Sequence, residues 1–222
     1  MSSSMPIVTE EIEIIETKRG GPPGPSKPPR GDGGDGGGGN GGDSRARQRA
    51  YVTGMTVALG GILMFFMALV SAYIVRKGTG DDWRVLEVPR VLWLNTAILI
   101  ISSFTLSRSR RDFLRDDFGN FRHWWYVTTA LGFLFLIGQL IAWRQLAAAG
   151  VFLATNPSSS FFYVFTAAHG LHILGGLGAL LGVAFHTGRR MTLATSSHIV
   201  AMYWHFMDGL WVFLFLLLLL GR

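Results

Sequence analysis

The chain has 222 residues, of which 49% are hydrophobic, and it contains no cysteine. The apolar residues are concentrated after residue 50, and this density excludes an ordinary soluble domain. The absence of cysteine excludes disulfides, iron–sulfur clusters, thiolate metal sites and cysteine nucleophiles. Any metal or haem bound by this chain would therefore depend on its six histidines.

Residues 1–50 are predicted to form a disordered, Gly/Pro-rich cytoplasmic tail. Seven acidic and seven basic side chains give this segment zero formal charge, so the net charge of +6 belongs to the rest of the chain. From Gly20 to Gly42 almost nothing is apolar, so the segment cannot bury enough surface to offset the entropy of ordering. We expect a solvated linker, with partner binding as the alternative. The late first apolar run is unlike a cleavable signal peptide.

Five apolar segments follow, and they predict an all-α integral membrane bundle of five transmembrane helices over residues 51–222. A helix of about 20 residues crosses a hydrocarbon core of about 30 Å. Four segments are long enough to cross this core as a helix. The second is the shortest, and it can cross if the flanking residues extend its helix. The segments run roughly over Tyr51–Val75, Val91–Leu106, Trp124–Trp143, Phe161–Phe185 and Ile199–Leu220.

Arginine and lysine in the short flanks predict the orientation. Ten of these residues lie on the side of the N-terminus and six on the other side. The positive-inside rule therefore favours a cytoplasmic N-terminus and an outside C-terminus. No aromatic-interleaved basic groove accompanies the excess charge, so no nucleic-acid partner is predicted.

Small residues four apart indicate where helices approach closely, because dispersion contacts drive helix packing in lipid. The pairs are Ala68 with Ala72 on the first segment, and Gly175 with Ala179 and Gly178 with Gly182 on the fourth. We predict that these positions form helix-packing faces.

Polar side chains inside the segments are the candidate site, because each costs several kcal/mol in hydrocarbon without a partner. Asp208 is the only carboxylate within the five segments. Trp204, Asp208 and Trp211 form one stripe of the fifth helix, which we expect to meet protein or a specific lipid. The predicted polar core, or lipid and subunit contact, consists of Asn95, Gln139, His169, His172, Trp204, His205, Asp208 and Trp211.

Asp208 is predicted to accept a hydrogen bond from His172 or His169. The two histidines are three residues apart and share a helix face, as do His205 and Asp208. A rise of about 1.5 Å per residue places His172 and Asp208 at one depth, roughly 17 to 18 Å below the outer surface. A buried clasp between the fourth and fifth helices would fix their register.

Two other uses of these histidines stay open. They could form the first shell of a metal, or hold a b-type haem between two helices. Two histidines three apart on one helix cannot serve opposite faces of one haem, and His-Glu-x-x-His and the other common catalytic motifs are absent. His123, His186 and His198 lie at segment ends, where solvent or headgroup contact is expected.

Several stretches resemble subunit III of the haem–copper terminal oxidases, the cytochrome c and quinol oxidases. The resemblance covers about residues 51–222 and is closest to the five-helix bacterial type. It rests chiefly on His169-Gly-Leu-His172 followed by a Gly-rich helix, on Tyr203-Trp-His-Phe-Met-Asp-Gly-Leu-Trp211, and on the stretch from Val91 to Ser103.

The resemblance implies a non-catalytic subunit with no active site, cofactor or metal site of its own. Haem and copper are expected in subunits I and II, with a small subunit IV as a further candidate partner. The chain would pack on subunit I in a bacterial inner membrane, bind phospholipid, and support assembly, oxygen access and sustained proton-coupled turnover. The resemblance also implies that His169, His172, His205 and Asp208 are polar core positions, with Asn95 and Gln139 beside them.

One position departs from the family pattern. Members often have a Ser-Glu pair in the helix before Met-Phe-Phe, and here Gly61 and Ile62 stand there. A proton role based on that carboxylate is therefore not expected in this chain. A small cytochrome b anchor or a transporter is the alternative function.

Overall fold

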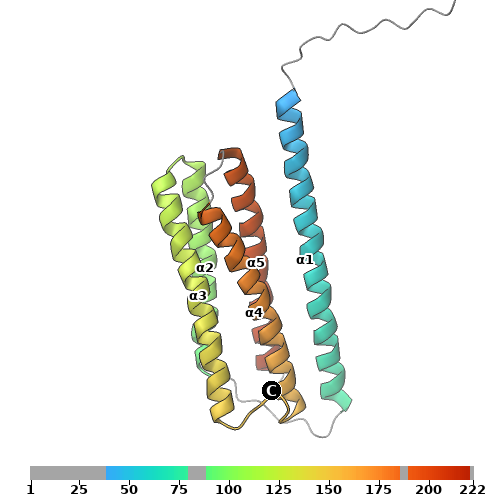
Figure 1. The fold of residues 1–222 in the computed structure, drawn as a ribbon. Coiled ribbons are helices and arrows are strands. Elements are labelled where there is room, and N and C mark those ends of the chain that lie inside the picture. Colours follow the sequence, from blue (N-terminus) through green and yellow to red (C-terminus); the bar gives the residue numbers. More distant parts are fainter. Residues whose placement is uncertain (1–38, 80–88, 186–189, 221–222) are drawn as a thin grey trace, which may run out of the picture. The chain divides into compact units, whose positions relative to one another are not determined.

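A computed structural model describes residues 39–79, 89–185 and 190–220. These residues form five α-helices, with no strand among them (Figure 1). The predicted all-α class is confirmed, and all five helices are long and apolar enough to cross a membrane. Most of the predicted tail, residues 1–38, lies outside the described residues. The helices are α1 (Gly39–Thr79), α2 (Val91–Leu114), α3 (Phe118–Ala148), α4 (Pro157–Ala184) and α5 (Arg190–Leu220).

The helices extend beyond the apolar segments that predict them. α1 begins at Gly39 rather than Tyr51, and α2 continues eight residues past Leu106. The extension of α2 is rich in arginine, which favours helix as strongly as leucine does. Hydropathy therefore locates the part of each helix that lies in hydrocarbon, and the backbone continues into the polar region.

Local signals in the sequence set the helix ends. Asp117 caps α3, because its side chain accepts a hydrogen bond from the backbone N–H of Asn120 at 3.1 Å. α4 begins with a capping box between Asn156 and Ser159, with Pro157 at its first position. α3 ends before Gly150, which adopts a positive φ of 75° that glycine tolerates without strain.

Helices α2 to α5 pack as a four-helix bundle. α2 contacts α3 and α5, and α4 contacts α3 and α5, which closes the ring (Figure 1). Large aromatic side chains fill the centre, and among them the tryptophans Trp125, Trp204 and Trp211 expose at most 1% of their surface. Such rings bury more apolar area than any other side chain, and their indole N–H groups need a partner.

Close approaches occur at glycines other than the predicted pairs. A Cβ on Gly138 of α3 would lie 1.9 Å from Oδ1 of Asn95, and a Cβ on Gly176 would lie 3.0 Å from the Tyr203 ring. Gly178 and Gly182, in contrast, have nothing within 4 Å of a built Cβ. Within this chain the predicted pairs do not form helix-packing faces: Ala68, Ala72 and Ala179 are exposed, and a Cβ on Gly175 would meet only the Tyr203 hydroxyl, at 3.8 Å. The spacing of small residues identifies a helix face lined by small side chains. It does not show whether a neighbouring helix packs on that face.

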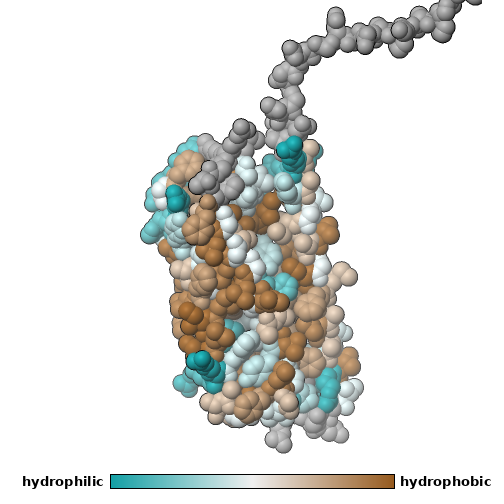
Figure 2. Space-filling view, in the orientation of Figure 1, coloured by the Kyte–Doolittle hydropathy of each residue, from teal (hydrophilic) through white to brown (hydrophobic). Residues whose placement is uncertain are grey.

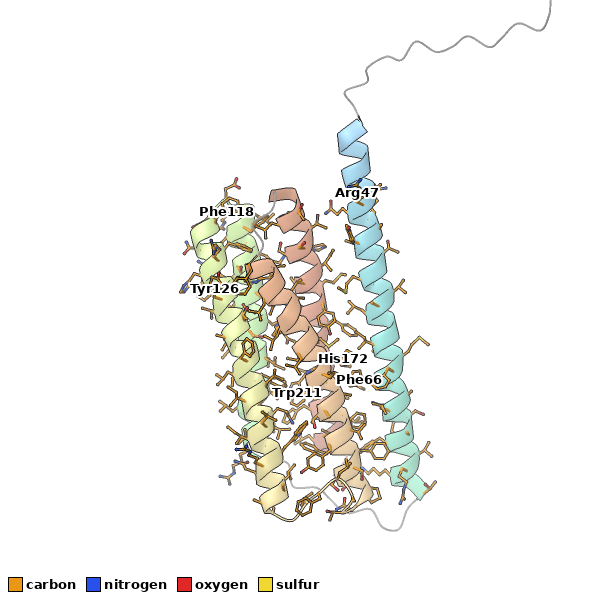
Figure 3. The ribbon with its side chains drawn as sticks, viewed as in Figure 1. Arg47, Phe66, Phe118, Tyr126, His172 and Trp211 are labelled. Atoms are coloured by element: carbon orange, nitrogen blue, oxygen red, sulfur yellow. The ribbon has the colours of Figure 1, made fainter. Side chains whose placement is uncertain are left out.

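Helix α1 contacts the bundle through aromatic side chains. Phe66 lies 5.6 Å from the His172 ring of α4, and the two face each other in Figure 3. Tyr73 packs edge-on against Phe161 at 5.5 Å. On the face shown in Figure 2, hydrophobic residues cover most of the middle of the helices, and hydrophilic residues gather toward their ends. This distribution is typical of membrane-spanning helices.

Candidate functional site

Hydrogen bonds between α2 and α5 form the most extensive polar arrangement among the described residues. His205 of α5 bonds through Nδ1 to the Ser103 hydroxyl and through Nε2 to the Ser107 hydroxyl at 3.3 Å. Closer to the helix end, Arg110 Nη2 donates to His198 Nδ1 at 2.8 Å. The partners follow opposite orders along the two helices, so α2 and α5 are antiparallel.

Both tryptophans of the α5 stripe donate to the same neighbouring helix. Trp204 Nε1 donates to the Ser102 hydroxyl at 3.0 Å, and Trp211 Nε1 donates to the Thr96 hydroxyl at 3.1 Å. Each indole thus buries its apolar rings and still satisfies its only donor. We refer to the paired groups of the two helices as the α2–α5 seam, and they are Thr96, Ser102, Ser103, Ser107, Arg110, His198, Trp204, His205 and Trp211.

His169 lies in the centre of the bundle. It is fully buried between the rings of Phe135 and Trp211, at centroid distances of 5.9 and 5.0 Å. Neither ring nitrogen has a hydrogen-bond partner among the described residues, and neither is accessible from outside. A haem iron or metal ion could reach these nitrogens only if the helices moved apart.

His172 points in a different direction from His169. Its Nδ1 donates to the carbonyl oxygen of Ala168 at 2.7 Å, while its ring meets Phe66 of α1. Its own carbonyl oxygen accepts a hydrogen bond from the Tyr203 hydroxyl at 2.8 Å. The two histidines therefore contact different helices although they are three residues apart.

The predicted clasp between Asp208 and the α4 histidines does not form. Both carboxylate oxygens of Asp208 are buried and have no hydrogen-bond partner among the described residues. Ser103 lies close to the carboxylate, but its hydroxyl bonds to His205. The clasp would require this polar face of α5 to meet α4, whereas its side chains His205, Trp204 and Trp211 bond to α2.

Asn95 and Gln139 occupy neighbouring places between α2 and α3. Asn95 Nδ2 donates to the Phe135 carbonyl oxygen at 3.3 Å, and its Oδ1 fills the space beside Gly138. Gln139, the next residue on α3, is buried, and none of its amide atoms has a partner within the described ranges. The structure thus brings Asn95, Phe135, His169 and Trp211 together through shared contacts.

Several contributing residues are missed by sequence reasoning. Hydroxyl groups join α2 to α3, because Thr105 and Thr128 share a hydrogen bond of 2.8 Å and Ser109 donates to the Phe121 carbonyl oxygen at 2.8 Å.

His198, expected at the solvated interface, is instead half-buried against Arg110. His123 is exposed as expected, and His186 lies outside the described residues. The i, i+4, i+7 spacing of Ser103, Ser107 and Arg110 is the signal that could have indicated the seam.

No group of three or more His, Asp or Glu side chains in the described part of the chain is placed to hold a metal ion. Many of its buried polar groups instead join one helix to another, as in the α2–α5 seam.

Comparison with known proteins identifies relatives of this chain. Residues 40–220 match the family described as "Cytochrome c oxidase subunit III". "Cytochrome c oxidase subunit 3" of Thermostichus vulcanus is 36% identical over 177 residues, which cover 75% of this chain and 85% of that protein. "Probable cytochrome c oxidase subunit 3" of Mycobacterium tuberculosis is 34% identical over 169 residues, covering 73% and 83%. "Cytochrome c oxidase subunit 3" of a Synechocystis species is 31% identical over 175 residues, covering 75% and 74%.

Proposed function

The chain belongs to the cytochrome c oxidase subunit III family, and from this premise we propose that it is the non-catalytic subunit III of a bacterial haem–copper oxygen reductase supplied by cytochrome c. Family membership confirms the resemblance stated from the residues and implies a complex with other oxidase subunits. In the proposal the chain packs on subunit I beside subunit II, with a small subunit IV as a further partner. Haem and copper are held by the partners, and the names of the relatives support cytochrome c as the electron donor.

The observation that supports a structural role is the α2–α5 seam. Its polar side chains are used to hold one helix against another: Trp204 with Ser102, Trp211 with Thr96, and His205 with Ser103. Hydrogen bonds between transmembrane helices contribute about 0.6 to 2 kcal/mol each, so the set specifies one register of α5 on α2. A bundle of fixed register can present a constant surface to a larger partner.

Apolar cavities between α1 and α5 support the lipid and oxygen parts of the proposal. One cavity of about 350 Å³ is lined by Leu63 and Met67 of α1 and by His205 and Phe213 of α5. A second of about 660 Å³ is bounded by Tyr73 on one side and Leu217 on the other. Walls of this kind suit lipid acyl chains, and they offer a low-polarity route for molecular oxygen.

The orientation of the chain belongs to the same proposal. Arg110, Arg111, Arg115 and Arg122 lie at the end of the bundle where α2 finishes and α3 starts. The positive-inside rule places this end in the cytoplasm, together with the start of α1. The C-terminus of α5 then lies outside, and the membrane is the bacterial inner membrane. Reaction of Arg115→Cys with a membrane-impermeant thiol reagent in intact cells would contradict this orientation.

Purification of the oxidase from cells with and without the chain tests the function. We expect a tagged chain to copurify with haem- and copper-containing subunits, and the oxidase lacking it to show a normal initial rate of oxygen consumption but faster loss of activity during turnover. Isolation of the chain alone, stable and without partners, would favour a transporter. A Soret band retained by the isolated chain would favour a cytochrome b and overturn the proposal.

A further inference from the structure

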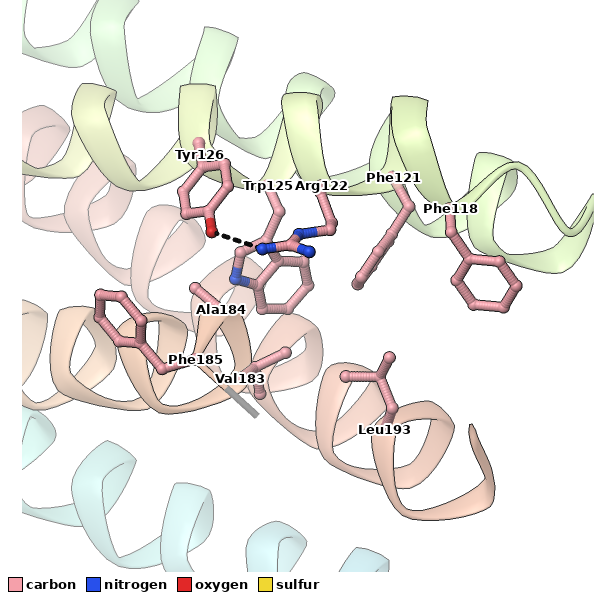
Figure 4. Close-up of a pocket in the computed structure, with 9 residues that line it drawn as sticks. All are labelled: Phe118, Phe121, Arg122, Trp125, Tyr126, Val183, Ala184, Phe185 and Leu193. Carbon is pink, nitrogen blue, oxygen red and sulfur yellow. Dashed lines mark hydrogen bonds between the residues drawn. The ribbon is translucent and has the colours of Figure 1, made fainter. Parts of the chain in front are cut away.

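A pocket outside the α2–α5 seam lies between the start of α3 and the end of α4. It has a volume of about 360 Å³, and Leu193 of α5 closes one side (Figure 4). Phe121 and Trp125 form its inner wall and are almost fully buried, while Phe185 at the rim is 73% exposed. The pocket is therefore an apolar recess with an exposed aromatic edge.

Arg122 supplies the single positive charge among the residues that line this recess. Its Nη2 donates to the Tyr126 hydroxyl at 3.3 Å, which holds the guanidinium beside the recess (Figure 4). A guanidinium carries five N–H donors, and the described residues use one of them here. The remaining donors form a fork suited to a phosphate group.

The position of Arg122 along α3 matches the level of lipid headgroups. Arg144 lies 22 residues further along the same helix, a distance of about 33 Å at 1.5 Å per residue, close to the hydrocarbon thickness of about 30 Å. Arg144 also lines a recess, of about 340 Å³, with Trp143 and Tyr163. The two arginines and their aromatic neighbours thus occupy the two interfaces of the membrane.

The surroundings of Arg122 favour an anionic ligand. Between Arg108 and Arg122 the chain carries five arginines and three aspartates. Asp112 lies 3.7 Å from Arg108, and Asp117 is bonded to Asn120, so two of the three carboxylates have partners other than Arg122. A soluble anion would not use the apolar wall, and a hydrocarbon would not use the guanidinium. An amphipathic anion uses both.

We propose that the recess between α3 and α4 binds one phospholipid with an anionic headgroup, whose phosphate contacts Arg122 and whose acyl chain lies along Phe121, Val183 and Phe185. The inference deepens the proposed function and rests on it for the lipid-binding role of the chain. It assigns that role to a named site between the start of α3 and the end of α4, which does not include the α1 contact at His172. The lipid comes from the leaflet on the side of Arg122.

Native mass spectrometry of the purified oxidase tests the site, with phosphatidylglycerol as the added probe. Arg122→Gln removes the charge and keeps a side chain of similar length. We expect the fraction of complexes carrying one phosphatidylglycerol to fall about tenfold, the loss that corresponds to one charge-assisted interaction. For phosphatidylcholine, the difference in bound fraction between wild type and Arg122→Gln should be smaller than for phosphatidylglycerol. Inorganic phosphate alone should not bind.

Arg115→Gln is the matched control, because Arg115 is an exposed arginine at the same end of the bundle but does not line the recess. Ala184→Phe is a second variant, which fills the recess and leaves Arg122 in place. We expect the control to retain the lipid and Ala184→Phe to lose it. Equal retention in wild type and Arg122→Gln would overturn the proposal, and so would equal loss in Arg122→Gln and Arg115→Gln.

The subunit composition of each preparation separates this inference from the proposed function. An intact oxidase with unchanged lipid content in Arg122→Gln contradicts the lipid site alone. A chain that purifies without haem- and copper-containing subunits contradicts the proposed function. In that case the same lipid measurement on the chain as purified still decides whether the recess binds phosphatidylglycerol.

Discussion

Trp204 of α5 lies where a side chain on Gly132 of α3 would have to be. A Cβ built on Gly132 would come within 2.7 Å of Cη2 of the indole and equally close to a methyl group of Leu177. The same indole donates its N–H to Ser102 of α2 and packs beside Gly176 of α4. One side chain of α5 therefore contacts all three other helices of the bundle.

Gly132→Ala should destabilise the bundle. The added methyl group forces the Trp204 ring or Leu177 to shift, and overpacking of this kind costs about 1 to 3 kcal/mol. The free energy of unfolding of the purified protein in mixed detergent and sodium dodecyl sulfate measures the change. Gly178→Ala is the control, since nothing lies within 4 Å of a Cβ at that position. Equal stability of the two variants would contradict the packing described for Trp204.

His205→Leu should weaken the α2–α5 seam. The substitution removes both ring nitrogens, which bond to Ser103 and Ser107, and leaves the two hydroxyls without that partner. We expect a loss of about 1 kcal/mol, the usual scale for an interhelical hydrogen bond in a membrane protein. The same unfolding titration measures it, with His123→Leu as the control because His123 is exposed. A larger loss in the control would argue against the seam.

Asp208→Asn should shorten the active life of the oxidase more than it lowers the initial rate. The carboxylate is buried beside Ser103 with no hydrogen-bond partner, and no cluster of His, Asp or Glu in the described ranges is placed to hold a metal ion with it. Oxygen consumption followed over many turnovers, together with subunit content, measures both quantities. Loss of haem reduction in a complex of normal composition would show that Asp208 takes part in electron transfer, contrary to the proposed function.

The cap of α3 should depend on pH. Hydrogen bonds from the backbone N–H and side chain of Asn120 lower the pKa of Asp117 below its usual value of 3.8. Because the pKa is lower in the folded state, the stabilisation is complete above the unfolded value and is lost as pH falls through the folded value. Amide hydrogen exchange of residues 118–121, corrected for the intrinsic rate, should show fraying in the wild type only below about pH 4.

Two substitutions make this measurement specific. Asp117→Ala should fray the first turn of α3 at every pH, since alanine cannot accept the Asn120 N–H. Asp117→Asn should keep the cap, because asparagine is an equally good capping residue, and it should remove the pH dependence. Persistent pH dependence in Asp117→Asn would assign the effect to another carboxylate.

The sequence anticipates the helices well and the contacts poorly. Hydropathy alone identifies all five helices, because a span of apolar residues has one stable form in lipid. The polar residues Asn95, His169 and Asp208 are likewise expected inside the bundle, and the structure buries them. Their partners are not anticipated: the expected Asp208–histidine bond is absent, and His205 pairs with serines of α2 instead.

Rotation of each helix about its own axis explains these differences. Counting residues along each helix predicts the depth of a side chain in the membrane, and it predicts one level for His172 and Asp208. Which neighbour a side chain meets depends on how Trp204 fits beside Gly132 and Gly176, and such fits arise only when the helices pack. The glycine pairs of α4 show the same effect, since Gly176 receives the indole while Gly178 and Gly182 face away from close neighbours.

By itself, the amino-acid sequence determined the number of membrane helices, their approximate ends, the exclusion of cysteine chemistry and, through its resemblance, the family. Those properties depend on local composition and on the free-energy cost of placing polar groups in hydrocarbon. Both are sums of contributions from the individual residues of a segment. Only the tertiary structure decided that α5 bonds to α2, that His169 is sealed between Phe135 and Trp211, and that Arg122 borders an apolar recess. These features depend on the steric fit between segments that are distant in the sequence. The composition and residue spacing of one segment do not determine that fit.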